Sequence, residues 1–195
     1  MDVLAQLARM KAEKQLSPRE VLLNRKLFPR LSNQNLAFRN RGDLTFADVS
    51  RKWGFDERSV SQAMATADLD NDGDLDLVVM HSNEEPGLYR SDTGAARVAV
   101  RLLGRGPNRA GIGAKIIVRG LPVTQSQEVI CAGRYLAADD PVRVFAAGSP
   151  TNRLSIEVRW RSGRVSELRD VPANSYCEID EPGAFRSGSL RLPLR

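Results

Sequence analysis

The chain has 195 residues, of which 42% are hydrophobic and only 6% aromatic. This length suits one large domain or two small ones, and the core must rest on Val, Leu, Ile and Ala. The net charge is +5, but only five of the 29 basic residues are lysines, and the arginines are scattered singly. Recognition of nucleic acid requires a clustered basic face, so the sequence disfavours a nucleic-acid partner.

Hydrophobicity along the chain gives no sign of a targeting segment. There is no run of about 18 apolar residues, so the sequence predicts no transmembrane span. Residues 1–14 are charged and amphipathic, and they lack the apolar segment and cleavage site of a signal peptide. We therefore expect no signal peptide within this chain.

Residues 1–30 are predicted to form two short helices. In the first, apolar side chains recur at helical spacing: Val3, Leu4, Leu7 and Met10. The segment 17–20 (Ser-Pro-Arg-Glu) is a capping box with proline at the first helical position. A second helix should therefore start there and continue to about Phe28.

Between residues 31 and 94 the pattern changes to short strands. Residues 33–49 alternate on both sides of a glycine-containing turn, which predicts a hairpin. The turn is Arg41-Gly42-Asp43, which resembles a cell-adhesion signal but is explained by turn chemistry alone. A polar link is expected at 91–95, and three further strands precede it: Gln62–Ala67, Leu75–Met80 and Gly87–Arg90.

From residue 96 onward, the alternation typical of strands is clear, and Val98, Val100 and Leu102 begin it. Several short strands at regular spacing predict a β-sandwich or barrel over 95–182. The further strands are expected at Ala114–Val118, Glu128–Cys131, Val142–Ala146, Leu154–Trp160, Val165–Leu168 and Tyr176–Ile179. The tail at 183–195 is predicted to be flexible. Cys131 and Cys177 match no metal motif and leave two options, one disulfide or two buried thiols.

The segment 68–76 (DLDNDGDLD) carries the sharpest chemistry in the chain. Ca²⁺ takes six to eight oxygen ligands, and a bound ion would offset the repulsion among five closely spaced aspartates. Gly73 permits the tight bend that such a loop needs. Mg²⁺ suits the loop less well because it prefers octahedral geometry with retained water. We expect Ca²⁺ to be held by side chains and by one backbone carbonyl, that of Asp74; the side chains are Asp68, Asp70, Asp72 and Asp76.

An EF-hand and an acidic turn without a metal are the two other interpretations of this loop. An EF-hand requires a bidentate glutamate at position 12, where this chain has Val79 within a predicted strand. The loop instead runs directly from one strand to the next. The remaining alternative is a solvated acidic turn without a metal.

The loop followed by residues 77–79 (LVV) resembles the FG-GAP (VCBS-type) repeat, which forms blades of calcium-stabilised β-propellers. Residues 40–49 (NRGDLTFADV) and 88–90 (LYR) resemble the flanking strands of such repeats. Three later segments resemble the ASPIC/UnbV domain: 108–118, 125–136 and 156–163. The combination resembles the cartilage acidic protein family, which places an FG-GAP propeller before this domain.

The resemblance implies a mainly β chain with short N-terminal helices. It implies a partial propeller-type FG-GAP unit at 31–94, followed by an ASPIC/UnbV-like β-sandwich or barrel at 95–182. A propeller needs four or more blades, so we expect this chain to be the C-terminal portion of a longer protein. Its open strand edges would allow self-association. Residues 144–148 (VFAAG) stand where the family has HFGLG, so the histidine of that segment is absent.

The resemblance also implies a function: a secreted, extracellular or periplasmic adhesion or binding protein without catalytic activity. Calcium would be structural, and the partner would be a protein or a glycan. His81 is the only histidine, so any His-dependent triad must use it, although a lone histidine is more often a satisfied structural residue. Two alternatives stay open: a hydrolase that uses carboxylates near the calcium site, and an arginine-mediated binder of anionic polymers.

Overall fold

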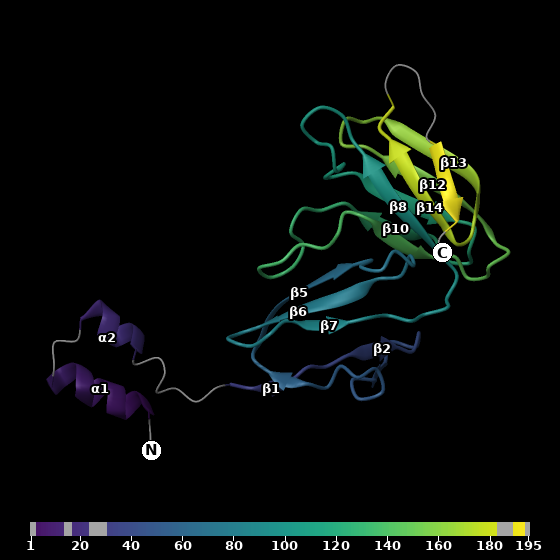
Figure 1. Cartoon of the computed structure of the whole chain (residues 1–195). Coiled ribbons are helices and arrows are strands. Elements are labelled where there is room, and N and C mark those ends of the chain that lie inside the picture. Colours follow the sequence, from purple (N-terminus) through teal and green to yellow (C-terminus); the bar gives the residue numbers. More distant parts are fainter. Residues whose placement is uncertain (1–2, 14–16, 24–30, 183–188, 194–195) are drawn as a thin grey trace. The chain divides into compact units, whose positions relative to one another are not determined.

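The computed structural model describes residues 3–13, 17–23, 31–182 and 189–193, which are mainly β with two short helices (Figure 1). This confirms the fold class that the sequence predicted. The chain divides into two compact units, Met1–Val60 and Ser61–Arg195.

The first unit begins with helices α1 (Val3–Glu13) and α2 (Pro18–Leu23). The predicted capping box is present, since Ser17 N donates to Glu20 Oε2 at 2.8 Å and Glu20 N donates back to Ser17 Oγ at 3.4 Å. These reciprocal bonds satisfy backbone groups that an uncapped helix start leaves exposed. The predicted continuation of this helix to Phe28 lies outside the described residues.

The first unit also contains two small antiparallel sheets. Strands β2 (Phe38–Asn40) and β3 (Phe46–Asp48) form the predicted hairpin, and β1 (Asn33–Gln34) pairs with β4 (Arg58–Ser59). At the hairpin turn, Gly42 has a φ of +83°. The Asp43 carboxylate accepts hydrogen bonds from Thr45 N at 3.0 Å and Thr45 Oγ1 at 2.6 Å. The turn interpretation of the Arg-Gly-Asp tripeptide therefore agrees with the structure.

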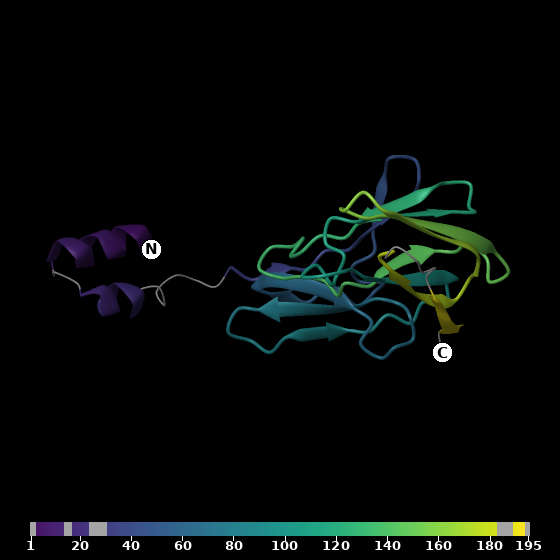
Figure 2. The same ribbon diagram turned by 90° about the horizontal axis from the view of Figure 1, so that it is seen from above.

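The second unit begins with a three-stranded antiparallel sheet in the order β5–β6–β7. Its strands are β5 (Ser61–Ala67), β6 (Asp76–His81) and β7 (Gly87–Tyr89), and Figure 2 shows them side by side. The segment 68–76 is the connection between β5 and β6, as the sequence predicted. Among the described residues these strands do not belong to a closed propeller.

The rest of the second unit is a sandwich of two four-stranded sheets (Figure 1). One sheet has the order β10–β9–β12–β13, and the other has the order β11–β8–β14–β15. Inward-facing residues of both sheets form one core, in which Val98, Ile116, Phe145, Ile156 and Cys177 are almost completely buried. The strand bounds are β8 (Arg97–Leu103), β9 (Lys115–Arg119), β10 (Gln125–Glu128), β11 (Arg143–Ala146), β12 (Arg153–Arg159), β13 (Val165–Pro172), β14 (Ser175–Asp180) and β15 (Ser189–Pro193).

The structure differs from the sequence prediction at two strands. The strand expected at Glu128–Cys131 lies three residues earlier, as β10. This strand is polar, and its two glutamines bind backbone carbonyls of β11 in the other sheet. Gln127 Nε2 donates to Val144 O at 3.0 Å, and Gln125 Nε2 donates to Ala146 O at 2.8 Å. Part of the tail expected to be flexible is β15, which pairs with β14. The glutamine contacts join the two sheets without backbone pairing, so the described strands form a sandwich and no closed barrel.

Candidate metal centre

The acidic loop folds back on itself because two of its residues adopt left-handed backbone conformations. Asn71 has a φ of +61° and Gly73 a φ of +89°, and these are the residue types that tolerate this region best. The bend turns backbone donors toward the first aspartate of the loop. Asp72 N donates to Asp68 Oδ1 at 3.1 Å, and Gly73 N donates to Asp68 Oδ2 at 2.9 Å.

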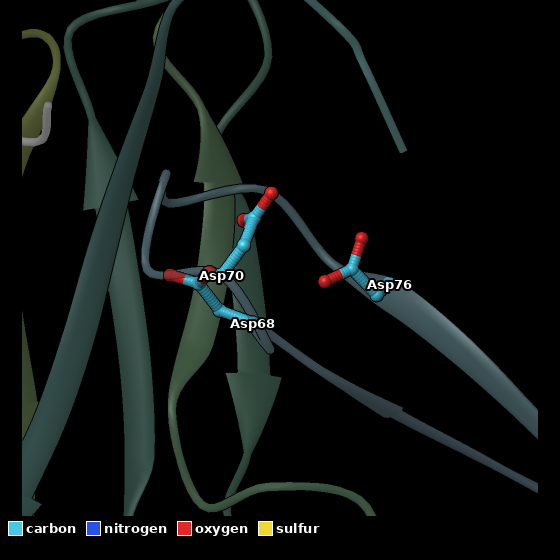
Figure 3. A group of neighbouring side chains, drawn as sticks. All are labelled: Asp68, Asp70 and Asp76. Atoms are coloured by element: carbon cyan, nitrogen blue, oxygen red, sulfur yellow. The ribbon is translucent and has the colours of Figure 1, made fainter. Parts of the chain in front are cut away.

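Three carboxylates from the two ends of the loop meet (Figure 3). Asp68, Asp70 and Asp76 each contribute an oxygen, and the three oxygens lie within 4.8 Å of one another. Two oxygens on opposite sides of one calcium ion lie about 5 Å apart, since each Ca–O distance is about 2.3–2.6 Å. The spacing and the hard oxygen chemistry of these donors fit Ca²⁺. Part of the shell would have to come from backbone carbonyls and water, as is usual for this ion.

The other two predicted ligands make different contacts. Asp72 Oδ1 accepts a hydrogen bond from Asp74 N at 2.9 Å, and Asp74 Oδ2 accepts one from Thr93 N at 3.0 Å. The Asp74 side chain is almost fully buried, and its Oδ1 accepts no hydrogen bond of ordinary geometry. Burial raises the pKa of Asp74 despite the opposing effects of Ser91, Thr93 and Arg97. The structure thus gathers three of the four predicted side chains, and the Asp72 and Asp74 carboxylates lie toward Arg97 and Thr93 instead.

Arg97 contacts the acidic loop although the sequence did not predict it. The Arg97 guanidinium lies 3.8 Å from Asp72 Oδ1 and 3.6 Å from Asp74 Oδ2, and Arg97 Nη2 donates to Asp72 O at 3.1 Å. Arg97 is the first residue of β8 and one of many scattered arginines, so no local pattern marked it. The one sequence feature that could have indicated a basic partner was the excess of negative charge in the loop, which a nearby cation would offset.

The only histidine, one tryptophan and one of the two cysteines are buried. His81 is buried, and its Nδ1 lies 3.2 Å from Ser61 Oγ. Trp160 belongs to the sandwich core and donates from Nε1 to Ser166 Oγ at 2.9 Å. Cys177 is a buried free thiol in the same core, whereas Cys131 is free but exposed, so neither predicted option, one disulfide or two buried thiols, describes both cysteines.

A second polar cluster lies beside the start of the loop. The Asp139 carboxylate accepts hydrogen bonds from Thr66 N at 2.8 Å, Thr66 Oγ1 at 3.0 Å and Arg134 Nε at 2.6 Å. Burial works to raise the pKa of Asp139, but these bonds and the charge of Arg134 outweigh it, so the pKa lies below its usual value. Thr66 is two residues before the first aspartate of the loop.

Comparison with known families locates two domains in the chain. Residues 21–79, which include the whole acidic loop, match an FG-GAP-like repeat, and residues 104–185 match the ASPIC and UnbV family. A search of curated proteins finds no match to this chain. Neither α1 nor α2, the two helices among the described residues, is long and apolar enough to cross a membrane. Domains of these two kinds are interaction or adhesion modules that are generally not catalytic. The chain therefore carries an FG-GAP-like repeat followed by an ASPIC and UnbV domain, in the order that its motifs predicted.

Proposed function

We propose that this chain is a calcium-supported interaction module, in which Ca²⁺ holds the 68–76 loop and a separate surface binds the partner. The observation that carries the proposal is the meeting of Asp68, Asp70 and Asp76 within 4.8 Å. Three carboxylates at this spacing repel one another unless a cation lies between them. Asp72 and the carbonyl of Asp74 complete the predicted ligand set. The location of the loop within an FG-GAP-like repeat supports calcium as the cation.

The partner is proposed to be a protein or a glycan, met in an extracellular or periplasmic setting. This follows from the domain types, since FG-GAP repeats occur in extracellular proteins. The proposal assigns no catalytic step to the chain. In support, His81 is buried and lies against Ser61, an arrangement that leaves its ring without access to a substrate.

The proposal predicts that calcium raises the thermal stability of the unit carrying the loop. A ligand that binds only the folded state at a hundredfold excess over its Kd contributes about 2.7 kcal/mol. For a unit of this size that is an upward shift in Tm of roughly 5–10 °C. Mg²⁺ should produce a much smaller shift, because it demands near-octahedral geometry and gives up its bound waters reluctantly.

Asp70→Asn is the sharpest variant for this test. Asp70 is exposed, and its hydrogen bond from Asp72 N is long at 3.3 Å, so the amide should preserve the fold while removing a charged ligand. Asp170→Asn is the matched control, because Asp170 is an exposed sandwich residue whose φ of +57° suits asparagine. We expect Asp70→Asn to lose most of the calcium shift and Asp170→Asn to keep it. If millimolar calcium left the Tm of the unaltered chain unchanged, the loop would be an acidic turn without a metal, and the proposal would be refuted.

The same proteins separate the proposal from its two rivals. A carboxylate-dependent hydrolase would show turnover that Asp70→Asn abolishes without loss of stability. A binder of anionic polymers would show affinity that falls steeply between low and moderate salt. The arginines on one sandwich face argue against this rival, because Arg119 and Arg159 are engaged by Glu157 at 2.8 and 2.5 Å.

A further inference from the structure

The last two aspartates of the loop, Asp74 and Asp76, are held by the segment 91–97, which leads directly into β8. Ser91 N donates to Asp76 Oδ1 at 2.9 Å, and Thr93 N donates to Asp74 Oδ2 at 3.0 Å. Asp76 therefore takes part both in the metal cluster and in the attachment of this segment. The carboxylate that completes the cluster is the one that anchors the start of the sandwich.

Arg97 fixes the end of the same segment. Its Nη1 donates to Thr93 O at 2.7 Å, and its Nη2 donates to Asp72 O at 3.1 Å. Only 15% of its side chain is exposed, so the guanidinium depends on these partners in place of water. The next residue, Val98, is fully buried in the sandwich core. A short stretch of chain thus links the aspartate loop to the core.

A second attachment holds the other end of the loop. Asp139 accepts hydrogen bonds from both Thr66 N and Thr66 Oγ1, while Asp140 N donates to Thr66 O at 3.0 Å. Thr66 lies within the FG-GAP-like match, and Asp139 and Asp140 lie within the ASPIC and UnbV match. Segment 91–97 lies in the interval 80–103 that neither match covers. The loop is therefore bound on both sides by the following domain and its link.

We propose that the aspartate loop is a calcium-dependent joint: Ca²⁺ binding to the FG-GAP-like repeat stabilises the sandwich that follows it. This inference rests on the proposed calcium site. Without the ion, repulsion among the aspartates opposes the conformation in which Asp74 and Asp76 receive Thr93 and Ser91. With the ion, that conformation is favoured, and the segment leading into β8 is held. In this arrangement Arg97 is a positioning residue and does not ligate the metal.

Coupling of this kind is reciprocal. If calcium favours the formed joint by some factor, then the formed joint raises calcium affinity by the same factor, commonly about five- to a hundredfold. A variant that loosens the joint should therefore weaken calcium binding by up to that factor. Arg97→Gln distinguishes two possible roles of Arg97, because they change calcium affinity in opposite directions. If Arg97 were only a competing positive charge, its removal would tighten calcium binding. If it positions the loop, its removal weakens binding.

The joint can be observed directly in the sandwich. The chain has two tryptophans: Trp160 is buried in the sandwich core, and Trp53 is more than half exposed in the first unit. In a Trp53→Phe background of the full chain, Trp160 fluorescence therefore reports the unfolding of the sandwich alone. Denaturant unfolding would be followed in Ca²⁺ and in EGTA, and calcium affinity would be measured in parallel by titration calorimetry.

We expect Ca²⁺ to move the Trp160 midpoint to higher denaturant, and Arg97→Gln to remove at least half of that movement and to weaken calcium binding at least fivefold. Asp139→Ala, which loosens the second attachment without removing a positive charge, should act in the same direction and keeps the test available if Arg97→Gln fails to fold. Arg153→Gln is the matched control, because Arg153 is largely exposed and lies 3.9 Å from Asp170, so it should change neither quantity.

The outcomes distinguish this inference from the function on which it rests. Calcium binding by calorimetry with an unmoved Trp160 midpoint would leave the calcium site intact and overturn the joint. Tighter calcium binding by Arg97→Gln would also overturn it. Absence of calcium binding to the unaltered chain would refute the proposed calcium site and the joint together.

Discussion

The two cysteines should differ in reactivity by a large and calculable factor. Cys177 is fully buried in the sandwich core, and burial raises the pKa of its thiol to about 11. At pH 8 about one such thiol in a thousand is ionised, compared with about a quarter for an ordinary thiol of pKa 8.5. Ionisation alone therefore slows alkylation about two-hundredfold, and the need to open the core slows it further. Cys131 is exposed and carries no such barrier of access.

The assay is alkylation by iodoacetamide at pH 8, with each cysteine peptide quantified by mass spectrometry over time. We expect Cys131 to be modified within minutes, and Cys177 to be modified only when denaturant unfolds the sandwich. Cys131→Ser isolates the slow thiol, and its labelling rate should follow the unfolding curve. Equal rates for the two thiols would refute the packing of β14 into the core. Two unreactive thiols that become reactive after reduction would mean a disulfide, in conflict with the structure.

Two other perturbations test the fold around the site. The pKa of Asp139 is lowered in the folded state, so its carboxylate stabilises the fold above the unfolded-state pKa of about 3.9. That stabilisation is lost as pH falls through the lower folded-state pKa. Chemical denaturation should therefore show Asp139→Ala to be less stable than the parent at pH 7, and the difference should close below about pH 4. A gap that stays constant down to pH 2 would contradict the bond to Thr66. Gly104→Ala would place a Cβ 2.0 Å from Asn108 O, which the backbone must move to avoid, whereas Gly163→Ala has open space at a φ of +83°. Gly163→Ala should lower the free energy of unfolding by about 1–2 kcal/mol, and Gly104→Ala should lower it clearly more. Equal losses of stability would show that the turn after β8 differs from the one described.

Local patterns predicted most of the fold because the forces that create them act over a few residues. The alternation of Val98, Val100 and Leu102 records a strand with one face in the core, and β8 has that arrangement. The capping box at Ser17 and Glu20 closes within one helical turn, so the sequence was sufficient there. Strand β10 pairs with β9 but consists of Gln, Ser and Glu, so hydrophobicity gives no signal for it. Strand β10 was therefore predicted three residues late, at the apolar run that follows it.

The candidate site likewise combines local contacts, which the sequence predicts, with distant contacts, which it does not. The bend at Gly73 and the meeting of Asp68, Asp70 and Asp76 follow from the spacing of a nine-residue loop, and the sequence predicted them. The contacts of Arg97 with the loop span 25 residues, and that of Asp139 with Thr66 spans 73. Contacts at such separation are decided by how the sandwich folds. Neither residue stands out in composition or spacing.

The proposed calcium site would form partly from local and partly from distant contacts. The hydrogen bonds within the loop join residues two to seven positions apart and cost little chain entropy to close. The bonds that orient Asp74 and Asp76 come from segment 91–97, which is fixed only when β8 takes its place in the core. A loop that is locally preformed but completed by distant contacts reaches its full affinity only in the folded second unit. Calcium binding would then report the integrity of both domains together, which is how an ion bound to one domain can stabilise its neighbour.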